Sequence, residues 1–253
     1  MQQLTRTART AERDLLTPSK LVGMIRMLPD EYQYRVLWNN PEFGGNILYL
    51  PKDGDIKNGQ ELLICDNPEN REKAIRFKCD HMIATAKNLS ECFWHINKPY
   101  RIQILQITAG IYDFNGEYEK ILRDAWTSTE YPHQAKVESL IALFDKADPA
   151  KLMDDEEKAV LARLPDTFTV YRGYSETQVK AGYTKRRGLA WTVEKKMAAW
   201  FATRWNHKDP RLAEATACKS DVYMYTNCRG EREMVLNPRK LKNVTVRDVG
   251  RFE

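Results

Sequence analysis

The sequence predicts an α+β fold, in which a mostly helical N-terminal region is followed by a β-rich region. Two observations lead to this prediction. Apolar residues recur at helical spacing in several segments before Pro165, whereas the runs after Pro165 are short, rich in β-branched and aromatic residues, and separated by Gly, Asn, Asp and Pro. With 253 residues, of which 42% are hydrophobic, the chain can bury a sizeable core.

The region before Pro165 is expected to contain helices with a small pair of strands. The periodic segments predict helices over 18–28, 68–88, 116–126, 132–147 and 153–163. Turn residues flank two short runs that are expected to pair as strands, 47–50 and 61–65. Thr17, Asn67 and the acidic residues from Asp154 suit helix N-termini. Residues 101–112 are rich in β-branched side chains but alternate poorly, so a strand and a buried helix both fit.

The region from Pro165 onward is expected to be mostly β structure. Its strand-like runs are 167–173, 211–218, 220–226, 233–236 and 243–249. A single helix is predicted over 193–205, where Met197, Phe201 and Trp205 recur at helical spacing. We therefore divide the chain into an N-terminal α+β region over 1–110 and a domain over 111–253, the latter with a helical lobe (111–164) and a β-rich core (165–253).

Composition excludes several classes of protein. With 30% charged residues and a mean hydropathy of -0.62, the sequence has no apolar run long enough to cross a membrane, and its start lacks a secretory signal. Five widely spaced cysteines without a CxxC pair indicate neither a disulfide framework nor a zinc ribbon. A cytoplasmic protein without a membrane partner or a metal is expected.

Positive charge is concentrated near the C-terminus. From Pro165 onward there are 18 Lys and Arg against 10 Asp and Glu, a net charge of +8, and the rest of the chain carries -3, which together give +5. Such a segment attracts anions, and nucleic acid, a phosphorylated metabolite and an acidic protein face all remain open. Basic side chains that only solvate helix and strand surfaces would give the same excess.

Three short pieces of the C-terminal third carry candidate chemistry. Arg172 ends a β run before Gly173, where its fork of donors suits a diphosphate, although an edge-strand arginine paired with a surface carboxylate has the same sequence. Thr192 precedes the helix near Glu194 and can cap it or reach a carboxylate. Glu231 and Glu233 flank Arg232, so a strand period of two places both carboxylates on one face. A solvated pair bridged to Arg229 and Arg232 is the alternative.

Taken together, VYRGYS, GLAWT with the helix AWFATRW, and RGEREMVL resemble the arginine–serine–glutamate class of mono-ADP-ribosyltransferases. The resemblance covers about 80 residues, from Thr167 to about Val246, and extends to small phage and bacterial proteins with this fold. It implies an ADP-ribosyltransferase-like domain that consumes NAD as a substrate. One element departs from the family pattern, because Ala190 and Trp191 replace the first two residues of its Ser-Thr-Ser element and only Thr192 carries a hydroxyl.

The resemblance also implies a role for individual residues. Arg172 would bind the NAD diphosphate, the backbone of Gly173 would lie near the nicotinamide carboxamide, and Trp191 and Phe201 would complete the NAD site. Glu233 would be the catalytic glutamate, which binds a ribose hydroxyl and stabilises the oxocarbenium-like transition state. Glu231 would face the acceptor, as in arginine-modifying members of the family, and Thr192 would stand for the family's serine.

The expected activity is therefore transfer of ADP-ribose from NAD to a macromolecule, most favourably to arginine on a protein. Cleavage of the nicotinamide bond needs a carboxylate but no metal, and the sequence has no GxGxxG fingerprint of a dinucleotide-binding crevice. ADP-ribosylation of nucleic acid and NAD hydrolysis are the enzymatic alternatives. A non-catalytic nucleic-acid-binding protein, with Trp200 and Trp205 among its stacking residues, is the alternative from another class.

Overall fold

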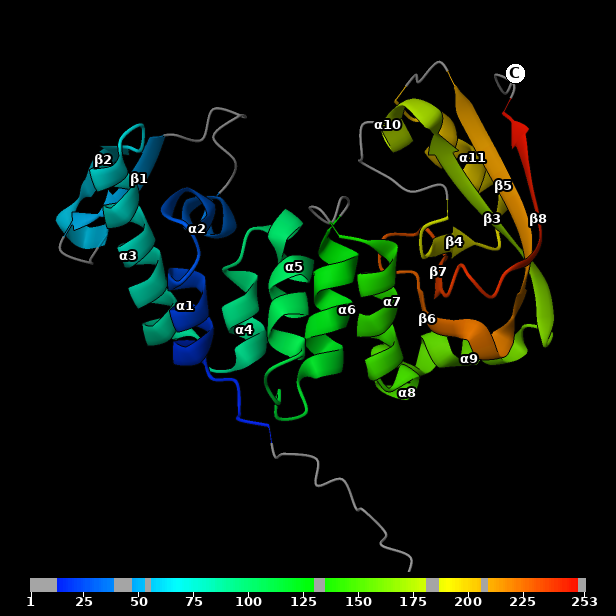
Figure 1. The fold of residues 1–253 in the computed structure, drawn as a ribbon, viewed down its shortest axis with the longest axis horizontal. Coiled ribbons are helices and arrows are strands. Elements are labelled where there is room, and N and C mark those ends of the chain that lie inside the picture. Colours follow the sequence, from blue (N-terminus) through cyan, green and yellow to red (C-terminus); the bar gives the residue numbers. More distant parts are fainter. Residues whose placement is uncertain are drawn as a thin grey trace, which may run out of the picture. The chain divides into compact units, whose positions relative to one another are not determined.

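The computed structural model describes residues 13–38, 47–52, 56–129, 135–180, 187–205 and 209–249. Within these ranges the chain combines helices with antiparallel sheets, so the predicted α+β class is confirmed (Figure 1). None of the helices in the described ranges is both long enough and apolar enough to cross a lipid bilayer.

The chain divides into two compact units. Unit 1 comprises Met1–Asn97 and Ile107–Glu117, and unit 2 comprises Lys98–Gln106 and Tyr118–Glu253. The boundary predicted after residue 110 falls within the second segment of unit 1. Residues 98–106 and 118–164 belong to the same unit as the C-terminal sheet.

Unit 1 contains a two-stranded sheet and several helices. Its elements are α1 (Pro18–Arg26), α2 (Asp30–Leu37), β1 (Ile47–Pro51), the 3-10 turn η3 (Ile56–Asn58), β2 (Gln60–Ile64), α3 (Pro68–Thr85) and α4 (Leu89–Trp94). The side chains of Thr17 and Asn67 cap α1 and α3, as their positions before Pro18 and Pro68 predict. The two predicted strands pair antiparallel, Tyr49 with Leu62. Helices α2 and α4 were not predicted.

Residues 101–109 of the segment 101–112 are helical, which decides between the strand and the buried helix that the sequence left open. Helix α5 (Lys98–Ala109) has a proline in its first turn and buries Ile102, Leu105 and Ala109. This spacing of three and four residues follows the helical period, and it outweighs the β-branched composition of the segment.

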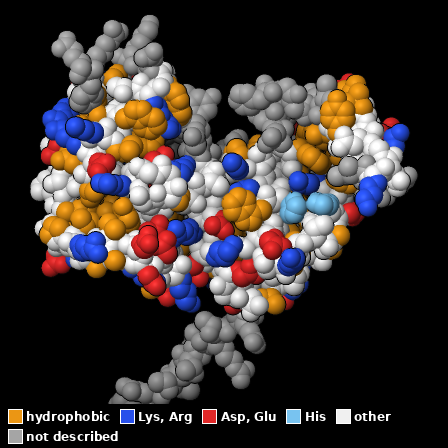
Figure 2. All heavy atoms as spheres, turned by 180° about the vertical axis from the view of Figure 1, so that it is seen from behind, with side chains coloured by type: hydrophobic (Ala, Val, Ile, Leu, Met, Phe, Trp, Pro, Cys, Tyr) orange, Lys and Arg blue, Asp and Glu red, His pale blue; other side chains and the backbone are white. Residues whose placement is uncertain are grey.

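In unit 1, the rings of Trp38, His81 and His95 take part in contacts between helices. The indole N–H of Trp38 donates to the carbonyl oxygen of Ala74, and the Lys78 ammonium lies 4.9 Å from the Trp38 ring centroid. The rings of His81 and His95 meet edge to face with centroids 5.3 Å apart, and a pale blue pair of rings is visible in Figure 2. Burial, followed by the charge of Lys78, lowers the pKa of His95. These contacts fasten α2, α3 and the end of α4 together.

Unit 2 contains the helical lobe and the larger sheet. The lobe consists of α6 (Tyr118–Ser128), α7 (Val137–Lys146), α8 (Pro149–Leu152) and α9 (Asp155–Arg163). The remaining elements are β3 (Thr167–Ser175), α10 (Glu176–Lys180), β4 (Ala190–Thr192), α11 (Lys195–Thr203), β5 (Pro210–Cys218), the turn η4 (Lys219–Asp221), β6 (Val222–Thr226), β7 (Glu233–Leu236) and β8 (Lys242–Asp248). The predicted helix 132–147 begins outside the described residues, because the structure describes this segment only from residue 135.

The strands of unit 2 form one six-stranded sheet in the order β6-β7-β4-β3-β5-β8, and its neighbours pair antiparallel. All five runs that the sequence predicts after Pro165 are strands here. The expectation of a single helix in this region is wrong, because the structure contains α10 in addition to α11. The short α10 directly follows β3. Its five residues are too few for apolar periodicity to reveal it.

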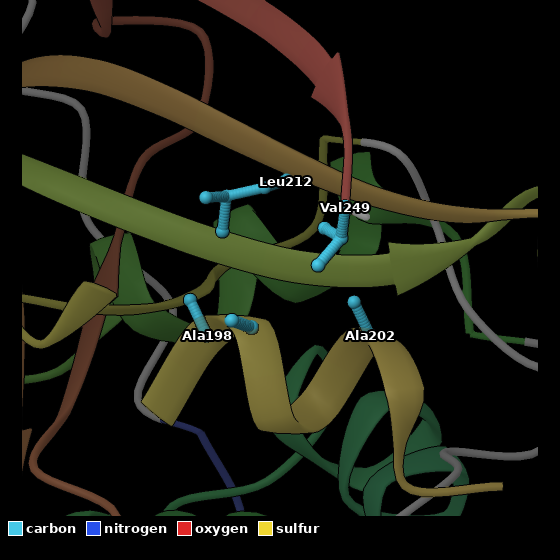
Figure 3. Packing of buried hydrophobic residues seen from close by; sticks show 5 residues of the cluster. Ala198, Ala202, Leu212 and Val249 are labelled. Atoms are coloured by element: carbon cyan, nitrogen blue, oxygen red, sulfur yellow. The ribbon is translucent and has the colours of Figure 1, made fainter. Parts of the chain in front are cut away.

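Helix α11 packs very closely on the sheet. Ala198 and Ala202 point from the helix toward the sheet, where Leu212 of β5 and Val249 complete a buried cluster (Figure 3). A Cβ atom added to Gly173 of β3 would lie 1.6 Å from the carbonyl oxygen of Ala198. Only glycine therefore allows this approach of helix and strand.

The helical lobe is attached to the sheet through ring contacts. Phe144 of α7 stacks on Tyr223 of β6 with centroids 5.4 Å apart, and it meets the ring of Trp126 of α6 edge to face at 5.2 Å. The Tyr223 hydroxyl donates to Asp145 over 2.5 Å. Helices α6 and α7 lie side by side in Figure 1. This packing brings an α6 side chain to the start of β7.

Candidate active site

Strands β3, β4 and β7 place three of the predicted residues next to one another. Thr192 is the register partner of Glu233 across β4 and β7, and Tyr171 is the partner of Thr192 across β3 and β4. Arg172 follows Tyr171 directly. Since β3 lies between β4 and β5, the alternative that Arg172 is an edge-strand residue is wrong.

Glu233 is a buried carboxylate with a specific partner. The residue is 7% exposed, and its Oε1 accepts a hydrogen bond of 2.9 Å from the indole N–H of Trp126, which is itself buried. Burial raises the pKa of Glu233, the Trp126 hydrogen bond and the charges of Arg229 and Arg172 lower it, and Glu231 raises it. Burial has the largest effect, so the pKa of Glu233 lies above its usual value, and the groups that favour the charged form offset burial only in part.

Glu231 lies close to Glu233, but for a different reason from the one predicted. Strand β7 begins only at Glu233, and Arg232 has a positive φ of 48°, so the strand period does not extend to Glu231. Both carboxylates instead meet the guanidinium of Arg229, whose Nη2 lies 2.9 Å from Oε2 of Glu231 and 3.7 Å from Oε2 of Glu233. The side chain of Glu231 is 18% exposed and that of Glu233 is 9% exposed, so Glu233 is the deeper group.

The two arginines that the sequence offered as partners of the carboxylate pair have different partners in the structure. Arg229 pairs with both carboxylates, whereas Arg232 forms an ion pair with Glu194 at the start of α11. Because Glu233 is buried, the alternative of a solvated carboxylate pair does not describe it.

Thr192 supports the loop that carries Glu231. Its Oγ1 accepts from the backbone N–H of Glu194 over 3.1 Å and lies 3.4 Å from the carbonyl oxygen of Glu231, to which it donates. The residue is buried. Its hydroxyl therefore joins the start of α11 to the loop before β7, and it positions Glu231 through the backbone.

Arg172 lies half-buried beside strand β4. Its Nη1 donates to the carbonyl oxygen of Ala190 over 2.5 Å, and a Cβ atom on Gly188 would lie 2.7 Å from its Nη2. Loss of hydration lowers the pKa of Arg172 to about 10, and the charge of Glu233 acts in the opposite direction. The two groups are thus electrostatically coupled, and the guanidinium is held by backbone on one side.

The other predicted NAD contacts have identifiable packing roles. Gly173 provides the close approach of α11 to β3. Trp191 is 2% exposed, lies on the opposite face of β4 from Thr192, and donates its indole N–H to the carbonyl oxygen of Gly188. Phe201 is half-buried, with the Arg204 guanidinium 4.6 Å from its ring centroid. The structure brings Arg172, Thr192, Glu231 and Glu233 together. That Gly173, Trp191 and Phe201 contact NAD stays a prediction.

Two site residues were missed by sequence reasoning as parts of a binding centre. Trp126 comes from α6, 107 residues before Glu233, and no local pattern links the two. The sequence offers Arg229 only as a salt-bridge partner in a solvated pair. Its position four residues before Glu233 and two before Glu231 was the available signal.

Comparisons of the chain with protein families, with curated proteins and with solved structures found no match. In the described ranges, no group of three or more His, Cys, Asp or Glu side chains is arranged to hold a metal ion.

Replacing Arg172 with lysine is expected to weaken NAD binding although the charge is kept. The ammonium cannot reproduce the planar fork of a guanidinium, so if Arg172 binds the NAD diphosphate, as the resemblance implies, we expect a roughly tenfold loss of affinity or more. Gly188→Ala should weaken binding as well, because the added methyl group displaces the same guanidinium. Calorimetric titration with NAD measures both, and wild-type affinity in the two variants would show that Arg172 does not contact NAD.

Removing the indole N–H of Trp126 is expected to shift the pH dependence of NAD cleavage. Trp126→Phe keeps a ring against Phe144 but removes the hydrogen bond that lowers the pKa of Glu233. If ionised Glu233 stabilises the ribose cation, as the resemblance implies, the acidic limb of the nicotinamide-release profile should move to higher pH. An unchanged limb in the folded variant would show that the hydrogen bond does not control this ionisation.

Proposed function

We propose that the chain transfers ADP-ribose from NAD to a macromolecular acceptor, with arginine on a protein as the favoured acceptor and nicotinamide as the leaving group. One observation carries the proposal. A buried carboxylate, Glu233, is fixed by Trp126, is electrostatically coupled to Arg172, and has Glu231 on its more exposed side. In this proposal unit 2 is an ADP-ribosyltransferase-like domain.

The arrangement fits the charge changes of NAD cleavage. When the bond between ribose and nicotinamide breaks, positive charge develops on the ribose and nicotinamide leaves as a neutral molecule. A carboxylate that is already in place and poorly hydrated stabilises that charge strongly, because little solvent has to reorganise. Arg172 would hold the diphosphate with its guanidinium, and water or an acceptor would then attack C1′.

The carboxylate pair also bears on the acceptor. Glu231 holds a guanidinium in the structure, that of Arg229, so its position suits an arginine acceptor. Two carboxylates at this place disfavour a phosphate backbone, which counts against nucleic acid as acceptor. NAD hydrolysis uses the same centre with water in place of the acceptor.

The nucleic-acid-binding alternative finds less support. Trp200 and Trp205 are exposed, at 52% and 42%, as stacking platforms would be. However, the Arg204 guanidinium already lies over both rings, at 5.4 Å and 3.9 Å from their centroids. On the face that Figure 2 shows, acidic and basic side chains are interspersed and do not form a basic stripe.

Incubation of the purified chain with adenine-labelled NAD and a cell lysate tests the proposal. We expect label in macromolecules that is lost after protease digestion and kept after nuclease digestion. If only nuclease removes the label, the acceptor is nucleic acid and not protein. Absence of both nicotinamide release and macromolecular label would contradict the proposed function.

Glu231→Gln is expected to separate transfer from hydrolysis. If Glu231 orients the acceptor and takes its proton, its loss should reduce transfer roughly a hundredfold, while water still reacts with the ribose cation and nicotinamide release continues. The measurement is nicotinamide release in parallel with labelling of lysate protein. Equal losses of both activities would place Glu231 in the NAD site itself.

A further inference from the structure

The side chain of Arg229 occupies the position in which an arginine acceptor would be held. Its Nη2 lies 2.9 Å from Glu231 and 3.7 Å from Glu233. The side chain is 36% exposed, more than those of Glu231 and Glu233, so its guanidinium approaches the carboxylates from the solvent side. The enzyme's own arginine is thus already bound where the proposed reaction would need a guanidinium.

The loop that carries Arg229 has a defined conformation. The backbone N–H of Gly230 donates to the carbonyl oxygen of Asn227 over 2.9 Å, and that of Arg232 donates to the Asn227 side chain over 3.1 Å. Gly230 and Arg232 both have positive φ, at 71° and 48°. These turns fold the loop back so that Arg229 reaches the carboxylates, whereas Arg232 points to Glu194.

We propose that Arg229 is a self-modification site, which receives ADP-ribose from NAD bound in the same chain. This inference rests on the proposed function and names an acceptor for it. The guanidinium of Arg229 first loses a proton to Glu231. The C1′–N bond of the nicotinamide riboside breaks and nicotinamide leaves with the bonding electrons. The freed lone pair of Arg229 then forms the new C1′–N bond, and Glu231 passes its proton to water.

Arg229 differs from other exposed arginines because its guanidinium is held next to Glu231 and Glu233. A guanidinium fixed next to the reacting centre has a high effective concentration, and its attack does not require a second molecule. The rate of self-modification per chain is therefore expected to be independent of protein concentration. Arg232 is the matched control, because it lies on the same loop but is paired with Glu194.

Peptide mapping by mass spectrometry after incubation of the purified full chain with NAD tests the inference. We expect one ADP-ribose on Arg229 and none on Arg232. The adduct should be absent in Arg229→Lys and present in Arg232→Lys. In a mixture of wild-type chain with an isotope-labelled Glu233→Gln chain, only the wild-type copies should be modified at Arg229.

Each other result contradicts the inference in a distinguishable way. Nicotinamide release without an adduct on Arg229 would overturn the self-modification and leave the proposed function standing. Adducts spread over several exposed arginines, or an equal amount on the labelled Glu233→Gln chains, would show trans modification without a preferred internal acceptor. Absence of nicotinamide release would overturn both proposals.

Discussion

Glu233→Gln is expected to abolish ADP-ribose transfer and nicotinamide release together, while the fold is kept. The amide has nearly the shape of the carboxylate, and its oxygen can still accept the hydrogen bond from Trp126. What it lacks is the negative charge opposite the ribose cation. Loss of one such preorganised interaction costs about 2.7–4 kcal/mol of transition-state stabilisation, a factor of about 10² to 10³ in rate. The measurement is the first-order rate of nicotinamide release at saturating NAD.

The control for this experiment is the thermal unfolding of the same variant. Because burial raises the pKa of Glu233, the folded chain gains little from this charge, and the variant should unfold at or near the wild-type temperature. A folded Glu233→Gln chain with a near-normal rate of nicotinamide release would contradict the assignment of Glu233 as the catalytic group.

Gly173→Ala is expected to have the largest effect on stability. A methyl group at this position would lie 1.6 Å from the carbonyl oxygen of Ala198 and 2.7 Å from the backbone nitrogen of Ala202. Both contacts are to the backbone of α11, so the helix must move away from the sheet and the buried cluster around Leu212 must open. We expect a loss of more than ~3 kcal/mol in the free energy of unfolding, measured by urea denaturation.

Gly188→Ala provides a matched control in the same unit. Its added Cβ would meet the end of the flexible Arg172 side chain at 2.7 Å and no backbone within the three nearest atoms. The guanidinium can move, so the free energy of unfolding should change much less than in Gly173→Ala. Equal losses in the two variants would show that the α11 contact is not the reason for glycine at position 173.

The sequence predicted the fold class and most elements because their signals are local. Pro18 after Thr17 and Pro68 after Asn67 mark helix starts that the side-chain caps confirm. The signal was weak where elements are short or their composition misleads. Helix α10 has only five residues, and the β-branched side chains of α5 concealed a buried helical face.

The candidate site was predictable only in its local part. Arg172, Thr192 and Glu233 are brought together by neighbouring strands, and the order of the three motifs anticipates this. The prediction from the strand period is wrong at Glu231 because the positive φ of Arg232 interrupts the strand. Arginine rarely adopts a positive φ, so the sequence gives no sign of this interruption. Trp126 could not be foreseen, since its contact with Glu233 depends on the packing of α6 through Phe144.

A crystal structure of the Glu233→Gln variant grown with NAD tests whether Arg172 and Glu233 form one NAD site, because the variant should bind NAD without cleaving it. We expect the diphosphate to lie against the guanidinium of Arg172 and a hydroxyl of the nicotinamide ribose to lie within hydrogen-bond distance of residue 233. NAD bound away from both residues, or an empty site in crystals grown at saturating NAD, would contradict this expectation.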